Sequence, residues 1–131
     1  GTTAITLPSA DGSADQVLTT DGSGTLSFVD NTGGTSWVAI KTGAYTASAG
    51  EGVFVNTTSS AFTITLPASP SLGDEVSIVD YAGTFDSNAC TIGRNSQPIM
   101  GVAEDLVVST ERASFTLVYV DGTQGWLFKG D

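Results

Sequence analysis

The stretch that decides the fold is Phe62–Asp80, FTITLPASPSLGDEVSIVD. Its first part, FTITL, alternates apolar residues with threonine, and EVSIVD resumes the same period of two. Such alternation is typical of β-strands with one buried face. Pro67 cannot donate a hydrogen bond to a neighbouring strand, and Pro70 and Gly73 are typical turn residues. The stretch therefore predicts strand, turn and strand, paired so that one apolar face is buried against a second sheet.

Strands are also expected on both sides of this stretch. Charged residues make up only 14% of the chain, threonine, serine and glycine are abundant, and no window shows apolar residues at helical spacing. The run SFTLVYV is apolar on both faces, which is typical of a central strand covered on both sides and suggests that another subunit covers one outer face. Asp121–Gly122 predicts a hairpin turn before GWLFK. The expected strands are residues 37–41, 53–56, 62–66, 75–80, 90–93, 106–109, 114–120 and 125–129.

This spacing of roughly seven to nine short strands predicts one all-β head domain over residues 35–131. We expect an antiparallel β-sandwich or a flattened barrel there. The TGGTS run at residues 32–36 is the expected joint between this domain and residues 1–34.

Residues 1–34 differ from the rest, because they hold short apolar clusters between DGS turns at Asp11–Ser13 and Asp21–Ser23. Strands this short cannot bury enough apolar area to offset the loss of chain entropy. Two alternatives follow: the segment is a disordered linker, or it shares an apolar core with other chains. The apolar alternation in TLSFV favours the second alternative.

The chain carries a net charge of −10 and no histidine. Such acidity disfavours binding to nucleic-acid phosphates and to anionic membranes, and no apolar run approaches the ~20 residues of a membrane-spanning helix. Neither a nucleic-acid partner nor membrane insertion is therefore expected. The lone Cys90 excludes an internal disulfide, and without a histidine base we expect it to be a partly buried apolar residue. The chain begins at Gly1, and we expect it to be part of a longer polypeptide.

Four stretches carry a resemblance to a known family. ITLPASPSLGDEVSIVDYAGTF, IGRNSQPIMGVAEDLVV and SFTLVYVDGTQGW resemble a module near the C-terminal ends of bacteriophage tail fibres, and ITLPSADGSADQVLTTDGSGTLSFVD resembles the shaft segments that precede such modules. The resemblance implies a virion structural protein that assembles as a homotrimer, with residues 1–34 as shaft and residues 35–131 as head. It implies two partners besides its own copies: the upstream part of the fibre, and a glycan or protein on the host-cell surface. Neither enzymatic activity nor a cofactor is expected.

Two other functions stay open: a purely architectural trimerisation cap, and a fragment of a polysaccharide depolymerase. Glycosidases use two carboxyl groups about 5 to 10 Å apart. The adjacent pairs Asp74–Glu75 and Glu104–Asp105 do not predict such a site, because neighbours on a strand point to opposite faces. No catalytic or metal-binding residue is therefore assigned, although a calcium ion that bridges carboxylates of several chains stays an alternative.

The long irregular segment at residues 81–95 is the candidate for receptor contact, since binding residues concentrate on loops of rigid scaffolds. Tyr81, Asp86, Asn88 and Arg94 are the expected contacts, because rings cover the apolar faces of sugars while polar groups bind hydroxyls. The alternative is an ordinary polar loop with Phe85 packed into the core.

Overall fold

The computed structural model describes residues 4–30 and 34–130. It divides into two compact units, unit 1 over Gly1–Gly34 and unit 2 over Thr35–Asp131. Within the described ranges the chain forms strands and turns and no helix, so none is long and apolar enough to cross a membrane. The predicted all-β class is confirmed.

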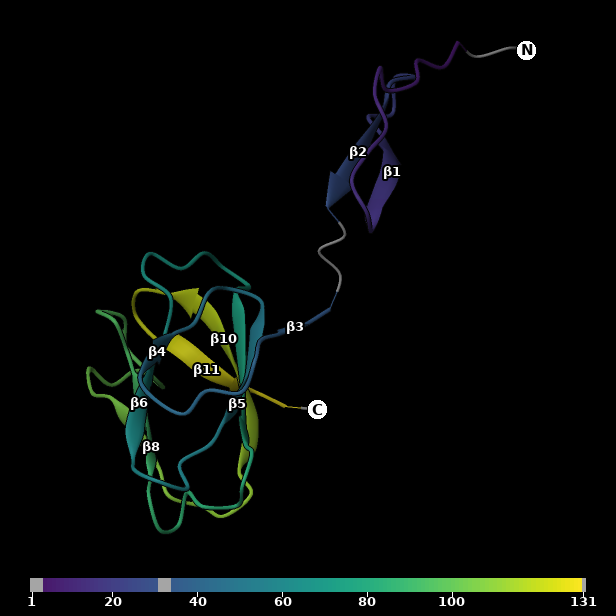
Figure 1. The fold of residues 1–131 in the computed structure, drawn as a ribbon. Helices are drawn as coiled ribbons and strands as arrows, with labels where there is room; N and C mark the ends of the chain where they lie inside the picture. The colour runs from purple at the N-terminus through teal and green to yellow at the C-terminus, as the bar shows by residue number, and fades with distance from the viewer. Residues whose placement is uncertain (1–3, 31–33, 131) are drawn as a thin grey trace. The chain divides into compact units, whose positions relative to one another are not determined.

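Unit 2 is built from two facing sheets (Figure 1). Its strands are β3 (Ser36–Trp37), β4 (Tyr45–Thr46), β5 (Glu51–Val55), β6 (Phe62–Thr65), β7 (Glu75–Asp80), β8 (Cys90–Gly93), β9 (Leu106–Val108), β10 (Ser114–Asp121) and β11 (Gly125–Lys129). The five-stranded sheet has the order β11-β10-β7-β5-β3, and the four-stranded sheet has the order β4-β6-β8-β9.

From β3 to β8 the chain passes from one sheet to the other at every step. Next-but-one strands therefore lie side by side. β3, β5 and β7 pair in parallel in one sheet, and β4, β6 and β8 pair in parallel in the other. The pairs β7–β10, β10–β11 and β8–β9 are antiparallel. Unit 2 is therefore a mixed β-sandwich.

The expected pairing within Phe62–Asp80 is wrong. The stretch does form two strands, β6 and β7, but they lie in different sheets. The proline-containing segment between them is longer than a tight hairpin turn and carries the chain across the core. The apolar side chains are nevertheless buried as predicted, with Ile64 and Leu66 on one side of the core and Val76 and Ile78 on the other.

Two further expectations about the sandwich need correction. It is not antiparallel throughout, because the crossings between sheets make neighbouring strands run in the same direction. It is also not a closed barrel, since no strand pairing among the described residues joins the two sheets.

The strand expected at residues 37–41 ends early because the chain bulges after Trp37. Trp37 lies opposite Gly52, but Lys41 lies opposite Val55, so this side of the pair holds one extra residue. A β-bulge of this kind interrupts the ladder. The sequence did not predict β4, because this strand has only two residues and lies between turn residues, so it shows no apolar alternation.

One apolar core fills the space between the sheets. Trp126 is its largest fully buried side chain, and Phe85 enters it from the segment after β7. The other buried apolar residues are Ala47, Val53, Val55, Ile64, Leu66, Val76, Ile78, Cys90, Ile92, Ile99, Leu117 and Tyr119. Both sheets contribute to the core, as the alternating pattern predicts.

Unit 1 is a small antiparallel hairpin of β1 (Gln16–Thr20) and β2 (Leu26–Asp30). The second DGS sequence forms its turn. There the Asp21 carboxylate accepts hydrogen bonds from the backbone N–H groups of Ser23 and Thr25, at 2.7 and 3.1 Å. This local bonding fixes the turn without any contribution from a core.

Candidate functional site

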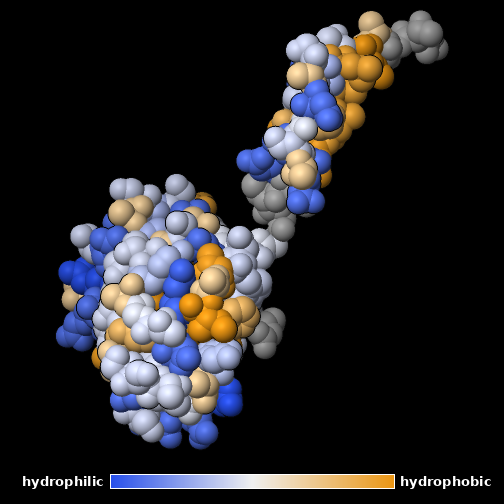
Figure 2. All heavy atoms as spheres, viewed as in Figure 1, coloured by the Kyte–Doolittle hydropathy of each residue, from blue (hydrophilic) through white to orange (hydrophobic). Residues whose placement is uncertain are grey.

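Unit 1 exposes most of its large apolar side chains. None of its described residues is buried, and the exposed fractions of its six most accessible large side chains run from 37% for Phe28 to 69% for Leu7. Figure 2 shows apolar side chains gathered along this unit. The six are Ile5, Leu7, Val17, Leu18, Phe28 and Val29. So much exposed apolar surface on so few residues is typical of an interaction surface.

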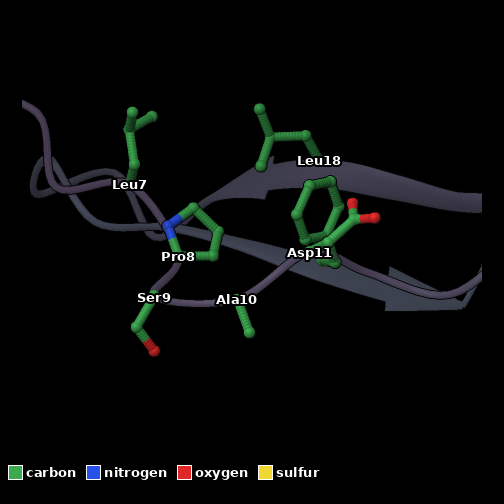
Figure 3. A pocket seen from close by; sticks show the side chains of 7 residues that line it. Leu7, Pro8, Ser9, Ala10, Asp11 and Leu18 are labelled. Carbon is green, nitrogen blue, oxygen red and sulfur yellow. The ribbon is translucent and has the colours of Figure 1, made fainter.

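Both faces of the β1–β2 hairpin carry an apolar pair. Val17 lies opposite Val29, and Leu18 lies opposite Phe28. Because successive residues on a strand point to opposite faces, the two pairs lie on opposite faces. Residues 7–11 line an open pocket of about 360 Å³ with Leu18 and Phe28; Leu7 and Leu18 point to the same side of it (Figure 3). Neither pair is buried within the unit.

In unit 2, the segment after β7 is organised by the buried carboxylate of Asp80. Its Oδ1 accepts hydrogen bonds from the backbone N–H groups of Gly83 and Thr84, at 3.0 and 3.1 Å. Its Oδ2 accepts hydrogen bonds from the N–H groups of Phe85 and Arg112, at 3.1 and 2.9 Å. These bonds hold the turn that places Phe85 in the core. The conformation of the loop is therefore fixed by hydrogen bonds to a buried carboxylate.

The same contacts set the pKa of Asp80. Burial acts to raise the pKa of this carboxyl, because it disfavours the charged form. The hydrogen bonds from Phe85, Arg112, Thr84 and Gly83 together outweigh burial and lower the pKa below its ordinary value. The charged form is therefore the one that the folded loop requires.

The structure separates the four residues expected to contact a receptor. Tyr81 and Asn88 are both held near the end of β5. The Tyr81 N–H donates to the carbonyl of Val55, the last residue of β5, at 2.9 Å, and the Asn88 side-chain amide donates to the Thr57 carbonyl at 2.9 Å. Arg94 follows β8, whose four residues carry the chain about 13 Å away from Cys90. The four side chains therefore do not form one cluster.

The four also differ in how free they are to bind. Tyr81 and Asp86 are exposed. Asn88 and Arg94 are half-buried, and the Asn88 side-chain amide is already bonded to the Thr57 carbonyl. Arg112, which the sequence reasoning missed, lies beside this loop and donates from its guanidinium to the Tyr81 carbonyl at 2.9 Å. A loop contact would therefore centre on Tyr81 and Asp86.

The outer face of the five-stranded sheet carries a row of residues that the sequence did not single out. The register places Trp37 opposite Gly52, Gly52 opposite Ser77, Ser77 opposite Thr116 and Thr116 opposite Lys129. Directly opposed residues share a face, so all five side-chain positions face the same way. This row, Trp37-Gly52-Ser77-Thr116-Lys129, is called the outer row below.

Trp37 forms one end of the outer row. Its ring stacks on the Phe54 ring with a centroid distance of 4.6 Å and an interplanar angle of 23°. It also occupies the space over Gly52, where a Cβ atom would lie 2.4 Å from Cε3 of the indole. Even so, 48% of Trp37 stays exposed. The absence of a side chain at Gly52 therefore lets a large aromatic ring rest on the sheet and remain accessible.

The middle and far end of the outer row are polar. The Ser77 and Thr116 hydroxyl groups lie 2.8 Å apart and share a hydrogen bond. Lys129 Nζ lies 3.1 Å from Glu75 Oε1 and 3.3 Å from Oε2. Trp37, Ser77, Thr116 and Lys129 all line one groove with a volume of about 510 Å³. This is the outer face that the sequence predicted to be covered by another subunit; in the single chain it is open.

Several other ionisable groups of unit 2 have structural partners or are buried. Asp74 accepts a hydrogen bond from the Ser71 N–H, while the adjacent Glu75 pairs with Lys129, so these two carboxylates have separate partners. Burial raises the pKa of the Cys90 thiol to about 12, which leaves it uncharged at neutral pH. Over the described ranges, no three His, Cys, Asp or Glu residues gather where they could hold a metal ion.

A comparison with protein-family models and with curated proteins finds no significant match to this chain. Its function therefore has to be inferred from its own residues.

Proposed function

We propose that this chain is the distal part of a trimeric virion tail fibre, with unit 1 as a shaft segment and unit 2 as a head that attaches to the host-cell surface. In this proposal three copies associate through unit 1, the upstream fibre continues from it, and the head faces the host. The chain acts by binding, without covalent chemistry.

The observation that carries the proposal is the exposed apolar surface of unit 1. The hairpin is ordered by its turn and its strand pairing, yet the Val17–Val29 and Leu18–Phe28 pairs remain exposed on opposite faces. A two-stranded hairpin alone is marginally stable in water. Association with other copies would bury both faces, and closed symmetric assembly is the usual form for identical chains. The resemblance to shaft segments of tail fibres favours three copies.

Attachment by the head follows from the same assembly. Three heads held together present three copies of every surface site, so weak single-site binding, of about millimolar affinity, is raised by ~10² or more through effective concentration. The contacts proposed from the sequence are Tyr81, Asp86, Asn88 and Arg94, of which Tyr81 and Asp86 are exposed. Asn88 is a weaker candidate, because its side-chain amide is already bonded to Thr57.

An architectural cap without receptor contact is the main alternative. It needs the same trimer, so only a binding experiment separates it from attachment. A depolymerase needs two carboxyl groups that converge on a substrate; Asp74, Glu75 and Asp80 are instead bonded to parts of their own chain.

Substitutions on unit 1 test the assembly. We expect Val17→Asp and Leu18→Asp each to lower the mass measured by light scattering, since a charge in a shared apolar core is strongly unfavourable. Leu72→Asp is the matched control, because Leu72 is an apolar residue of unit 2 with 77% of its surface exposed. Dissociation by the Leu72 change alone would place the interface on unit 2 and contradict the proposal.

Alanine changes in the head test attachment. Tyr81→Ala, Asp86→Ala and Arg94→Ala are made in the full chain, and binding to an array of bacterial surface glycans is compared with that of the parent. A decrease for at least one of them supports contact through these residues. If the parent binds and all three variants bind equally well, this contact assignment is wrong; if the parent binds nothing, the architectural alternative is favoured.

A further inference from the structure

We propose that the groove along the outer row binds a neutral saccharide, with one sugar ring against Trp37 and its hydroxyl groups bonded by Ser77, Thr116 and Lys129. The inference rests on the attachment role proposed above and assigns it a site on the sheet face, distinct from the loop residues.

Trp37 has the properties of a sugar-binding ring. Stacking on Phe54 and the space over Gly52 fix its position before any ligand arrives. An aromatic ring that is already fixed loses little conformational freedom on binding, so more of the contact energy appears as affinity. The exposed half of Trp37 is available to the C–H groups of a sugar ring, which need an apolar surface.

The polar part of the groove supplies hydrogen bonds next to that ring. The Ser77 and Thr116 hydroxyl groups both donate and accept, and the Lys129 ammonium donates. All three come from directly opposed residues on the neighbouring strands β7, β10 and β11, so their register is fixed by the ladder. A sugar, which has an apolar ring face and a rim of hydroxyl groups, matches an aromatic ring beside such a polar row.

The charge of the groove indicates a neutral ligand. Lys129, the charged residue among those that line the groove, is paired with Glu75 beside it, while the chain as a whole carries a net charge of −10. A polyanionic saccharide would be repelled by the surrounding field. The volume of about 510 Å³ lies within the range of about 300 to 1,000 Å³ that small-molecule sites occupy.

A second copy of the chain fits this groove less well. The centres of protein–protein interfaces are depleted in charged residues and enriched in apolar ones. Half of the residues that line this groove are polar or charged, namely Thr35, Ser77, Ser114, Thr116 and Lys129, and the other half are Trp37, Ile78, Val79, Phe115 and Phe128. Along the outer row two hydroxyl groups lie in the middle, with the Lys129–Glu75 ion pair at one end and the Trp37 ring at the other. This order favours a ligand that forms hydrogen bonds across the centre of the groove.

The test uses the full chain and a panel of neutral oligosaccharides of glucose, galactose, mannose, rhamnose and N-acetylglucosamine. Saturation-transfer NMR detects which of them bind, and the indole N–H signals of the two tryptophans report where. The signal that disappears in Trp37→Phe belongs to Trp37. We expect at least one oligosaccharide to shift that signal, while the signal of the buried Trp126 stays in place.

Three variants separate the groove from the rest of the head. Trp37→Ala is expected to weaken binding about tenfold or more, as for other central aromatic contacts, and Trp37→Phe to retain most of it. Gly52→Ala is expected to weaken binding without unfolding, because the three heavy atoms nearest to the added Cβ all belong to the half-exposed indole ring of Trp37. Val107→Ala is the control, since Val107 is an apolar residue with 61% of its surface exposed and lies on β9 in the other sheet, outside the groove. Tyr81→Ala is measured beside it, because it separates contact through the loop from contact through the groove.

Each outcome decides the inference. It is overturned if no oligosaccharide of the panel gives saturation transfer, if binding depends on Tyr81 and not on Trp37, or if the Trp37 side chain is shielded by a second copy and does not respond. The mass of the same samples is measured in parallel. A trimer that binds no saccharide overturns the inference and leaves the proposed fibre assembly standing, whereas a monomer contradicts that assembly whatever it binds.

Discussion

Asp80 shows how one carboxylate can order a whole loop. Its two oxygens accept hydrogen bonds from four backbone N–H groups, two each; three of these groups lie in the segment after β7 and one, that of Arg112, lies before β10. Asparagine has nearly the same shape, but its amide nitrogen would face N–H groups that need an acceptor. We expect Asp80→Asn to destabilise the protein by roughly 2 to 4 kcal/mol, measured by chemical denaturation, because buried donors lose their partner.

Asp86→Asn is the control for that change. Asp86 is exposed on the same segment, so the substitution is expected to alter the free energy of unfolding by no more than about 0.5 kcal/mol. Equal effects of the two substitutions would mean that the hydrogen bonds of Asp80 contribute nothing specific.

The lowered pKa of Asp80 also predicts an acid dependence of stability. The folded-state pKa lies below the unfolded value of about 3.9, so the unfolded chain binds the proton more readily. The resulting stability is fully present above pH 4 to 5 and is lost as the pH falls through the folded-state pKa. Thermal melts from pH 6 down to pH 2 should show a smaller loss for Asp80→Asn than for the parent. Parallel curves for the two proteins would contradict this assignment.

Trp126, on the strand that the sequence predicts after Asp121–Gly122, is fully buried in the core. Its ring lies 5.5 Å from the Tyr119 ring, and its indole N–H has no hydrogen-bond partner among the described residues. Trp126→Ala is expected to cost about 3 to 5 kcal/mol. Trp126→Phe should cost less, since it keeps a ring and removes the unpaired N–H. An alanine variant that melts within a degree or two of the parent would show that this burial contributes little.

The final hairpin depends on the backbone conformation of Gly125, where β11 begins. Its φ angle is +71°, and a Cβ atom there would lie 1.8 Å from the Pro98 carbonyl oxygen. We expect Gly125→Ala to destabilise by more than the roughly 1 to 2 kcal/mol of the left-handed conformation alone, because the chain at Pro98 must also move. Gly43→Ala is the control, since nothing lies within 4 Å of that position. If both alanine variants unfold at the same denaturant concentration, the close approach to Pro98 has no energetic weight.

The sequence predicts strands far better than it predicts their partners. Alternation in FTITL and EVSIVD states which side of each strand is buried, and those side chains are buried in the structure. It does not state which strands pair, because a residue that faces the core does so equally well in a hairpin or in two opposed sheets. The crossings between sheets and the bulge after Trp37 are therefore visible only in the structure.

The candidate sites differ in the same way. The segment of residues 81–95 could be proposed as a binding loop because its residues are consecutive. In the structure, strand β8 separates Arg94 from Tyr81. The outer row could not be found from spacing, since its five residues come from five strands and meet only through the register. Trp37 and Gly52 can both be seen in the sequence, but nothing in the sequence shows that the two residues lie opposite each other.

Taken together, unit 2 has its own core and unit 1 has none among its described residues. A chain with this contrast is expected to fold its head alone and to stabilise its N-terminal segment through other copies. The fold class of residues 35–131 follows from the sequence, whereas the number of copies rests on the resemblance and on the exposed apolar pairs of unit 1.

The mass of the native chain at micromolar concentration, measured by multi-angle light scattering, tests this account most directly. Three copies associated through unit 1 predict a mass three times that of the 13.3 kDa chain, independent of dilution across the micromolar range. A mass of 13.3 kDa would contradict the shared shaft and with it the proposed fibre.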